Sequence, residues 1–165
     1  MTLLKPLFQW MSPAGTQARL SVLIFHRVLR KPDPLFPDEM HAHRFDTLCS
    51  WLKSWFSVLP LDQAIAHLKT GTLPARAACI TFDDGYADNY QWAMPILQRY
   101  GLTATFFIAT GFLNGGRMWN DTIIESVRHC KAPVLDLSSL GWGQHAIASI
   151  DEKKAAIVSL IHQIK

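Results

Sequence analysis

Continuous apolar runs along the chain predict the strands of a sheet. The two clearest runs span Ser21–Val28 and Ala77–Phe82, and a third, rich in β-branched and aromatic residues, spans Thr103–Ala109. Runs of this length without alternation are typical of strands in a parallel sheet, so we expect the first two to be buried on both faces. Shorter runs at Ser57–Leu59 and Val134–Leu137 predict two further brief strands.

Helical spacing of apolar residues between these runs predicts the connecting helices. The stripe that favours the first helix consists of Phe45, Leu48, Cys49, Leu52 and Phe56. A second helix is expected over Leu61–Thr70, with Gly71 as its stop. A third is expected from about Asn89 to Tyr100, although an internal proline disfavours a regular helix there. Either a kink at Pro95 or a helix that begins near it would resolve the conflict.

Two more helices are expected in the last third of the chain. Asn120 or Asp121 is a candidate cap for a helix that ends near His129. The capping box Ser149–Glu152 begins a helix that runs to Lys165 without a stop signal, which leads us to expect a chain cut short. Strands and helices alternate, and this order is typical of an α/β fold with a parallel sheet.

Composition excludes several classes of protein. The 165 residues, 49% of them apolar, suffice for one domain with a real core. A formal charge of +3 without a basic run argues against nucleic acid as a partner. No apolar run approaches the roughly 18 residues of a membrane span. Because the N-terminus does not resemble a secretory leader, we expect a cytoplasmic location.

The three cysteines predict no disulfide framework. Cys49, Cys79 and Cys130 are odd in number and widely spaced, which fits neither paired disulfides nor a CxxC metal knuckle. Cys49 and Cys79 lie within apolar patterns, so we expect buried free thiols.

The segment Thr81-Phe-Asp-Asp-Gly-Tyr86 carries the most informative chemistry. Asp83 and Asp84 follow a buried strand, at the end where α/β folds build their sites. Adjacent carboxylates repel unless a cation or a shared proton relieves them, and Gly85 allows a sharp turn after them. Asp-Asp-Gly is also ordinary turn chemistry in solvent, and composition alone leaves both readings open.

The string Thr-Phe-Asp-Asp-Gly after an apolar strand resembles the first motif of the polysaccharide deacetylases, the NodB homology family or carbohydrate esterase family 4. Two flanking segments extend the resemblance to roughly residues 20–130: Ile24-Phe-His-Arg-Val28, and the stretch from Pro95 to Ile108. The resemblance implies a distorted (β/α) barrel and removal of N-acetyl groups from a glycan.

The resemblance also implies roles for the two carboxylates. Asp83 would be the general base, and Asp84 a ligand of a divalent metal, typically zinc, that polarises the acetamide carbonyl. The family takes its other ligands from a later His-Ser/Thr-x-x-His motif, and no two histidines of this chain have that spacing. A later Arg-x-x-Pro-Tyr type motif and the late general-acid histidine are missing as well. We therefore expect the N-terminal part of a deacetylase, inactive by itself and weak in zinc binding.

Other residues are weaker candidates for the same site. His26 follows the first strand and could contact the metal or be structural, whereas the pair His41 and His43 more readily suits a solvated surface. Tyr86 and Trp119 could contact a sugar, or could be a helix-start residue and a packed aromatic next to a cap. The Asp-x-Asp-Gly phosphatase motif does not fit, because Asp83 and Asp84 are contiguous.

The sequence thus predicts an α/β chain with a truncated, partial (β/α) barrel of the deacetylase type. We expect an N-terminal extension over residues 1–20 and the incomplete domain over 21–165. The expected partner is an N-acetylated glycan, and an open barrel would expose sheet edges that favour association. The alternative is a non-catalytic relative of the same fold that binds carbohydrate or acts as a scaffold.

Overall fold

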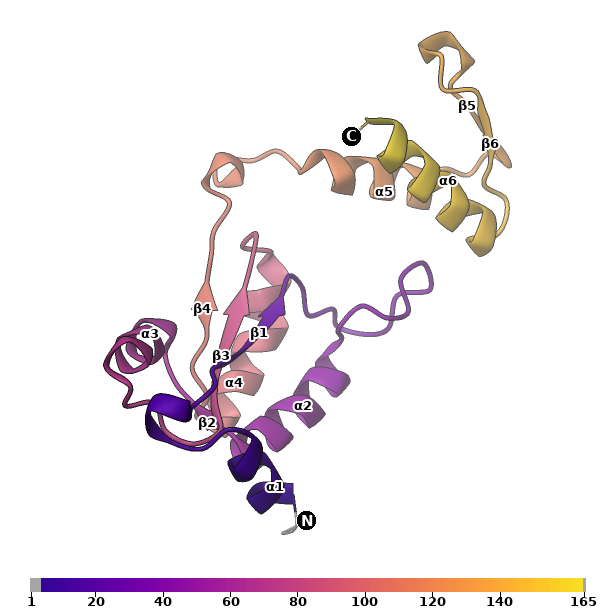
Figure 1. Ribbon diagram of the computed structural model, residues 1–165. Coiled ribbons are helices and arrows are strands. Elements are labelled where there is room, and N and C mark those ends of the chain that lie inside the picture. Colours follow the sequence, from indigo (N-terminus) through magenta and orange to yellow (C-terminus); the bar gives the residue numbers. More distant parts are fainter. Residues whose placement is uncertain (1–3, 165) are drawn as a thin grey trace. The chain divides into compact units, whose positions relative to one another are not determined.

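A computed structural model describes residues 4–164, which form two compact units (Figure 1). The first unit comprises the chain up to Pro32 together with Asp38–Ala109, and the second comprises Asp33–Pro37 and the chain from Thr110 onward. This division does not test the boundary expected after residue 20, which stays a prediction. None of the helices in residues 4–164 is long and apolar enough to cross a membrane.

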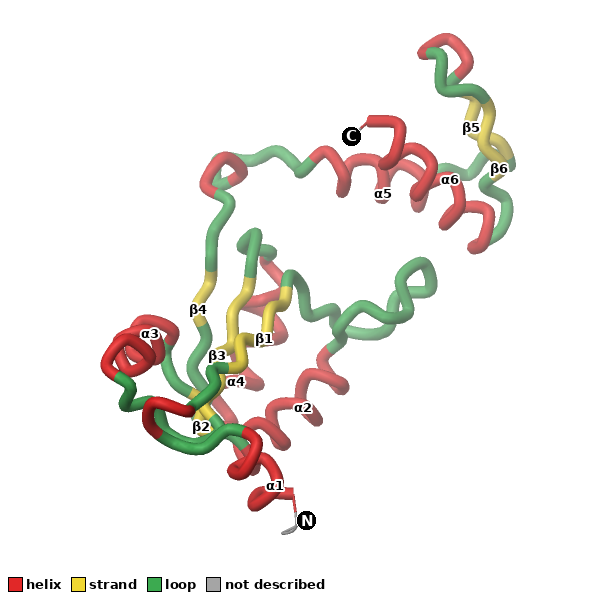
Figure 2. The backbone as a smooth tube through the Cα atoms, in the orientation of Figure 1, coloured by secondary structure: helices red, strands yellow, loops and turns green. Residues whose placement is uncertain are grey.

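A parallel sheet of four strands organises the first unit (Figure 2). The strands are β1 (Ser21–Phe25), β2 (Ser57–Val58), β3 (Ala77–Phe82) and β4 (Thr105–Phe106). β1 pairs with β3 from Ala78 to Phe82 and so occupies one side of it. The start of β3 pairs with β2 and its end with β4, which therefore share the other side. The parallel α/β arrangement expected from the sequence is confirmed.

Helices cover the two faces of β3. The helices α2 (Ala42–Trp55) and α4 (Met94–Tyr100) pack against Ile80 and Phe82. Helix α3 (Leu61–Thr70) packs against Ala77 and Cys79 on the opposite face, because successive side chains of a strand point to opposite sides. Every residue of β3 is consequently buried, as its apolar run predicts.

The short N-terminal helices complete this unit. Helix α1 (Leu4–Met11) places Phe8 against Trp55 and Phe56, at the start of the parallel strands. A 3-10 turn, η1 (Gly15–Gln17), leads into β1. The stop at the end of α3 is confirmed, since Gly71 has a left-handed φ of 66°.

Two of the expected strands differ from the prediction. β1 ends at Phe25, and Val22 and Ile24 are 45% and 62% exposed, so the expectation of burial on both faces is wrong for this strand. β1 has a single neighbour among the described strands, and no helix covers that part of its outer face. β4 is limited to two residues because it pairs only with the end of β3, and Phe107 beyond it is exposed.

The conflict at Pro95 is resolved by a change of helix type. Helix α4 begins at Met94, so Pro95 lies in its first turn, where no backbone N–H donor is required. A π-helix, η2 (Asn89–Ala93), precedes it, and the sequence pattern did not predict this element. Helix α4 thus begins near Pro95, as one of the two expected solutions has it, but the helical path already starts at Ala87 and continues through the π-helix.

The second unit is built from two helices and a hairpin. Together with two short 3-10 turns, its elements in chain order are η3 (Thr110–Phe112), α5 (Trp119–His129), β5 (Val134–Asp136), η4 (Ser138–Leu140), β6 (Gln144–Ala146) and α6 (Ile150–Ile164). β5 and β6 pair antiparallel, and β6 was not predicted. Helix α5 begins before Asn120 and Asp121, so neither caps it. The Ser149–Glu152 capping box is confirmed by reciprocal hydrogen bonds of 2.8 and 3.2 Å.

A segment from the first third of the chain belongs to this unit. Leu35 is buried with Val127, Ile147 and Ile157. The two guanidinium nitrogens Nη1 and Nη2 of Arg128 donate to both carboxylate oxygens of Asp33, the first at 2.9 Å and the second at 2.6 Å. This bidentate pair attaches the segment Asp33–Pro37 to α5, although nothing in the local sequence pattern relates the two segments.

Candidate functional site

Asp83 and Asp84 lie immediately after β3, at the carboxyl end of the parallel strands. The backbone N–H of Asp83 donates to the carbonyl of Phe25 in β1 at 2.8 Å. On the other side, the N–H of Phe107 donates to the carbonyl of Phe82 at 2.8 Å. The two carboxylates therefore follow a backbone that is fixed by both neighbouring strands, and both residues are half-buried.

The turn at these residues is tighter than a common β-turn. The N–H of Gly85 donates to the carbonyl of Asp83 at 2.9 Å, which closes a three-residue γ-turn around Asp84. Asp84 has a φ of 71°, a left-handed value that residues other than glycine rarely adopt. Such strain persists only where surrounding structure enforces it, and it clusters at functional sites.

Gly85 is required here for both backbone and steric reasons. Its φ is 73°, and a Cβ atom added to it would lie 2.9 Å from Cδ1 and 3.2 Å from Cγ2 of Ile108. Any other residue at this position would both strain the turn and collide with the segment that follows β4.

The loop that leaves β1 is attached to the same region by side chains that follow the carboxylates. Asp88 accepts hydrogen bonds from Nε of Arg27 at 2.8 Å and from the N–H of Val28 at 3.4 Å. Asn89 donates from Nδ2 to the carbonyl of His26 at 3.1 Å. The arginine side chain also lies over the ring of Tyr86, 4.6 Å from its centroid.

Sequence reasoning missed the roles of Asp88 and Arg27, and no short motif marks them. Their pairing joins residues 61 positions apart, so only the tertiary structure brings them together. Asn89 is 3% exposed, and its Oδ1 has no hydrogen-bond partner in the structure. A buried polar atom without a partner is uncommon, and here it lies at the base of the strand-end loops.

A small hollow borders the carboxylate turn. Its volume is about 230 Å³, and Gly85, Tyr86 and Asn89 line it together with the apolar side chains of Met94, Phe106 and Ile108. Asp83 and Asp84 are not among its lining residues, but Gly85 joins it directly to them. An apolar wall beside a turn with two carboxylates offers space for a small ligand group.

The described residues do not form a complete metal site. No three histidine, cysteine or acidic side chains between residues 4 and 164 are placed so that they could hold a metal ion together. His26 is exposed at the end of β1, and pairing with β3 brings its backbone beside Asp83. A tetrahedral catalytic zinc needs three protein ligands, so residues 4–164 by themselves do not fit one.

The second unit holds the remaining sugar-contact candidate. Trp119 begins α5 and is 46% exposed.

The histidine pair belongs to the first unit. His41 precedes α2 and lies near His43, with ring centroids 6.4 Å apart.

Comparison with known proteins relates one segment of the chain to a family. The model of the family described as polysaccharide deacetylase matches residues 70–132, which include β3, the carboxylate turn and α4. The matched residues are therefore similar to part of a polysaccharide deacetylase domain. The deacetylase segment so defined contains Asp83 and Asp84, whereas β1 and His26 lie outside the matched residues.

Curated relatives of this deacetylase segment agree with the assignment. The putative polysaccharide deacetylase YxkH of Bacillus subtilis is 33% identical over 93 residues, covering 55% of this chain and 32% of the relative. The poly-β-1,6-N-acetyl-D-glucosamine N-deacetylase of Staphylococcus aureus is 39% identical over 83 residues, covering 50% of this chain and 29% of the relative. The chain thus matches less than a third of the length of these relatives.

The fold agrees with a solved deacetylase structure. Streptococcus pyogenes deacetylase PplD, solved in complex with acetate, superposes with a TM-score of 0.53 at 22% identity, covering 66% of this chain and 52% of that one. At this identity the similarity supports the fold, and it confirms the expectation of a partial domain of the NodB deacetylase type.

Proposed function

We propose that this chain supplies the carboxylate part of a deacetylase site that removes N-acetyl groups from an amino-sugar glycan. The observation that carries the proposal is the strained turn at Asp84, fixed by β1 and β4 at the carboxyl end of β3. The names of the relatives support the reaction class, since they are polysaccharide and glucosamine N-deacetylases.

The backbone favours this role over that of an ordinary solvent turn. A loop free to choose its residue would gain from glycine at a φ of 71°, because glycine has no steric cost there. Asp84 holds this conformation between two hydrogen-bonded strands, which fix the backbone that carries its carboxylate. Such rigid placement is what a catalytic group needs.

The chemistry proposed for Asp83 is proton transfer. Its carboxylate takes a proton from a water molecule as the oxygen of that water attacks the acetamide carbonyl carbon. When the tetrahedral intermediate breaks its C–N bond, acetate is released and the sugar nitrogen needs a proton. The donor of that proton belongs to the part of the site that these residues do not supply.

The proposal also includes a bound metal ion. Asp84 would be one ligand of a divalent cation, zinc as the family resemblance implies, and His26 a second. The further ligands would come from outside residues 1–165, either from a longer product or from a second polypeptide. The chain alone should therefore bind zinc weakly and release no acetate.

Substrate contacts are proposed for Tyr86 and Trp119. The side chain of Arg27 lies over one face of the Tyr86 ring, so a sugar that stacks on that face would have to displace it. The exposed indole of Trp119 offers a stacking surface within the second unit.

The free side of β1 also favours association. β1 pairs only with β3 among the described strands, and Val22 and Ile24 beside this edge are exposed. We propose that another strand pairs there, as unpaired edges readily recruit a partner.

A second candidate function is carbohydrate binding without catalysis. The absence of a three-ligand cluster among residues 4–164 favours it for the chain in isolation. Zinc affinity separates the two functions, because a binding module has no need of Asp84 as a ligand.

The test begins with zinc titration of the chain by calorimetry. Asp84→Asn should remove the weak zinc affinity, and Asp38→Asn, at an exposed aspartate remote in sequence from the turn, should leave it unchanged. A chain whose zinc affinity does not respond to Asp84→Asn would contradict the ligand role.

Acetate release from an N-acetylglucosamine oligomer tests the reaction. The 165-residue chain should release none, and a product of the same reading frame that includes a His-Ser/Thr-x-x-His segment should release acetate in an Asp83-dependent manner. Robust release by the 165 residues alone would refute the incomplete site, and activity that survives Asp83→Asn would refute the base.

A further inference from the structure

The N-terminal helix α1 presents a contiguous apolar surface to solvent. Leu7, Trp10 and Met11 are 49%, 82% and 50% exposed. They are spaced i, i+3 and i+4, so they lie side by side on one face of the helix. Isolated exposed apolar residues are normal, but three large neighbours on one short helix form a patch, here called the α1 patch.

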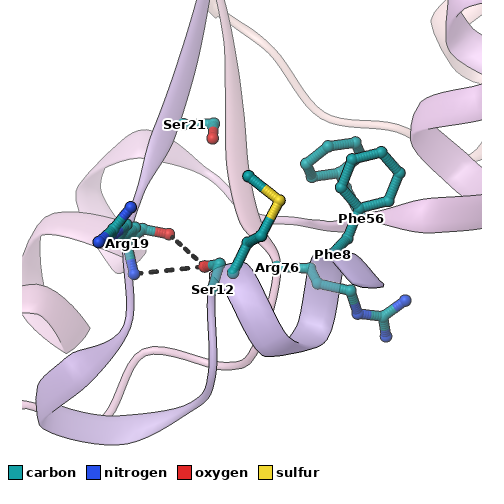
Figure 3. A pocket seen from close by; sticks show the side chains of 7 residues that line it. Phe8, Ser12, Arg19, Ser21, Phe56 and Arg76 are labelled. Atoms are coloured by element: carbon teal, nitrogen blue, oxygen red, sulfur yellow. Dashed lines mark hydrogen bonds between the residues drawn. The ribbon is translucent and has the colours of Figure 1, made fainter. Parts of the chain in front are cut away.

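The helix is held firmly, so this exposure does not come from a loosely attached terminus. Phe8 of the same helix packs against Trp55 and Phe56, with ring centroids 6.0 and 5.5 Å away, and Figure 3 shows it beside Phe56. Ser12 follows the helix and donates from Oγ to the carbonyl of Arg19 at 3.0 Å, and its own carbonyl accepts from the N–H of Arg76 at 2.9 Å. These contacts fix the α1 patch against the start of the parallel strands.

Positive charge accompanies the α1 patch. Met11 and the exposed Arg19 line the same hollow of about 290 Å³, whose lining also includes Arg76 and no acidic residue. An apolar patch bordered by cations is complementary to a surface with anionic headgroups above hydrocarbon.

The aromatic composition favours the same partner. Tryptophan is enriched where one end of a side chain is apolar and the other is wet, as at a bilayer interface. Trp10 is the most exposed large apolar side chain of the described residues. Phe8 of α1 contacts Trp55 on α2. Trp55 in turn stacks on the exposed Trp51, with ring centroids 5.6 Å apart.

We propose that the α1 patch and Arg19 bind the surface of an anionic lipid bilayer. The helix is too short to span a membrane and would lie in the interface, with Leu7, Trp10 and Met11 inserted. The α1 patch lies beside the start of β3 and the carboxylates follow its end, about 20 Å away along six residues of strand. Binding at α1 would leave the carboxylate turn free, and the inference does not depend on the deacetylase proposal.

Vesicle sedimentation of the 165-residue chain tests the proposal. Vesicles with 30% phosphatidylglycerol in phosphatidylcholine should bind the chain, and pure phosphatidylcholine vesicles should bind it about tenfold less. Leu7→Ser/Trp10→Ser should lower the partition coefficient on anionic vesicles about tenfold or more, and Arg19→Glu should lower it several-fold. Salt at 0.5 M should weaken binding, because it screens exposed charges.

Matched variants distinguish binding through the α1 patch from non-specific hydrophobic binding. Leu113→Ser/Leu140→Ser removes two other exposed leucines, which are 67% and 61% exposed, and should leave vesicle binding unchanged. Trp10→Phe should keep binding but lose most of the fluorescence quenching by brominated lipids. Circular dichroism should show that each variant remains folded.

Three results would overturn the proposal. The first is no difference between anionic and neutral vesicles, and the second is equal loss of binding in the Leu113/Leu140 control. The third is a dimer, seen by sedimentation equilibrium without lipid, that dissociates on Leu7→Ser/Trp10→Ser, since the α1 patch would then contact a second copy.

Discussion

Gly85→Ala probes the turn that holds the two carboxylates. The substitution forces an L-residue into a φ of 73°, which costs about 1–2 kcal/mol. The new Cβ would lie 2.9 Å from Cδ1 of Ile108, and overpacking of this kind costs about 1–3 kcal/mol. The lower entropy of the unfolded chain offsets about 0.4–1 kcal/mol. We therefore expect a net destabilisation of the first unit by about 2–3 kcal/mol.

Gly101→Ala is the matched control in the same unit. Gly101 has a φ of 57°, but the nearest atom to its added Cβ is the flexible Nζ of Lys53 at 3.8 Å. This variant carries the backbone strain without the collision, so it should cost only about 1 kcal/mol. The difference between the two variants measures the steric contact with Ile108.

Ile108→Val should partly rescue Gly85→Ala. The substitution removes Cδ1, the atom in closest approach, and costs little by itself because Ile108 is 46% exposed. The double variant should be more stable than the sum of the single effects by about 1 kcal/mol.

Hydrogen exchange localises these effects. Peptides that cover β3 should lose protection in Gly85→Ala, whereas peptides that cover α6 should keep it, because the two elements belong to different units. A Gly85→Ala variant no less stable than Gly101→Ala, or one that Ile108→Val does not rescue, would refute the account of the turn.

Three further predictions concern the rest of the chain. The hydrogen-bonded guanidinium of Arg128 lowers the pKa of Asp33 below its ordinary value of 3.8. The pair should therefore stabilise the second unit at pH values above 3.8, and this stabilisation should be lost as the pH falls below 3.8. Asp33→Asn should cost about 1–2 kcal/mol in urea unfolding at pH 7, and a loss that persists unchanged at pH 2.5 would contradict the pairing. Burial raises the pKa of Cys49 to about 12, so iodoacetamide at pH 8 should label the half-buried Cys130 first, as mass spectrometry would detect; equal labelling in the folded chain would contradict burial. Lys153→Met should destabilise α5 by about 1 kcal/mol, because its amine donates to two carbonyls at the end of that helix, and thermal unfolding unchanged from the parent would contradict this role.

The sequence determined the elements whose signals are local. A six-residue apolar run is enough to predict β3, since a strand with both faces covered needs no polar positions. The stripe of α2 and the capping box at Ser149 are equally local, because they depend on residues within a few positions of one another. The place of Asp83 and Asp84 at a strand end followed from the same reasoning, as did the family resemblance.

Only the tertiary structure decided the features that depend on neighbours distant in sequence. β1 and β3 look alike as apolar runs, yet Val22 and Ile24 of β1 are exposed because none of the described core clusters covers that face of β1. The left-handed backbone of Asp84 lies between the N–H of Asp83, which donates to β1, and the segment after β4, which donates to the carbonyl of Asp84. The pairing of Arg27 with Asp88 joins the loop after β1 to the helical segment that follows the carboxylates. Periodicity indicates which side of an element is apolar, whereas the whole fold determines which other elements pack against that side.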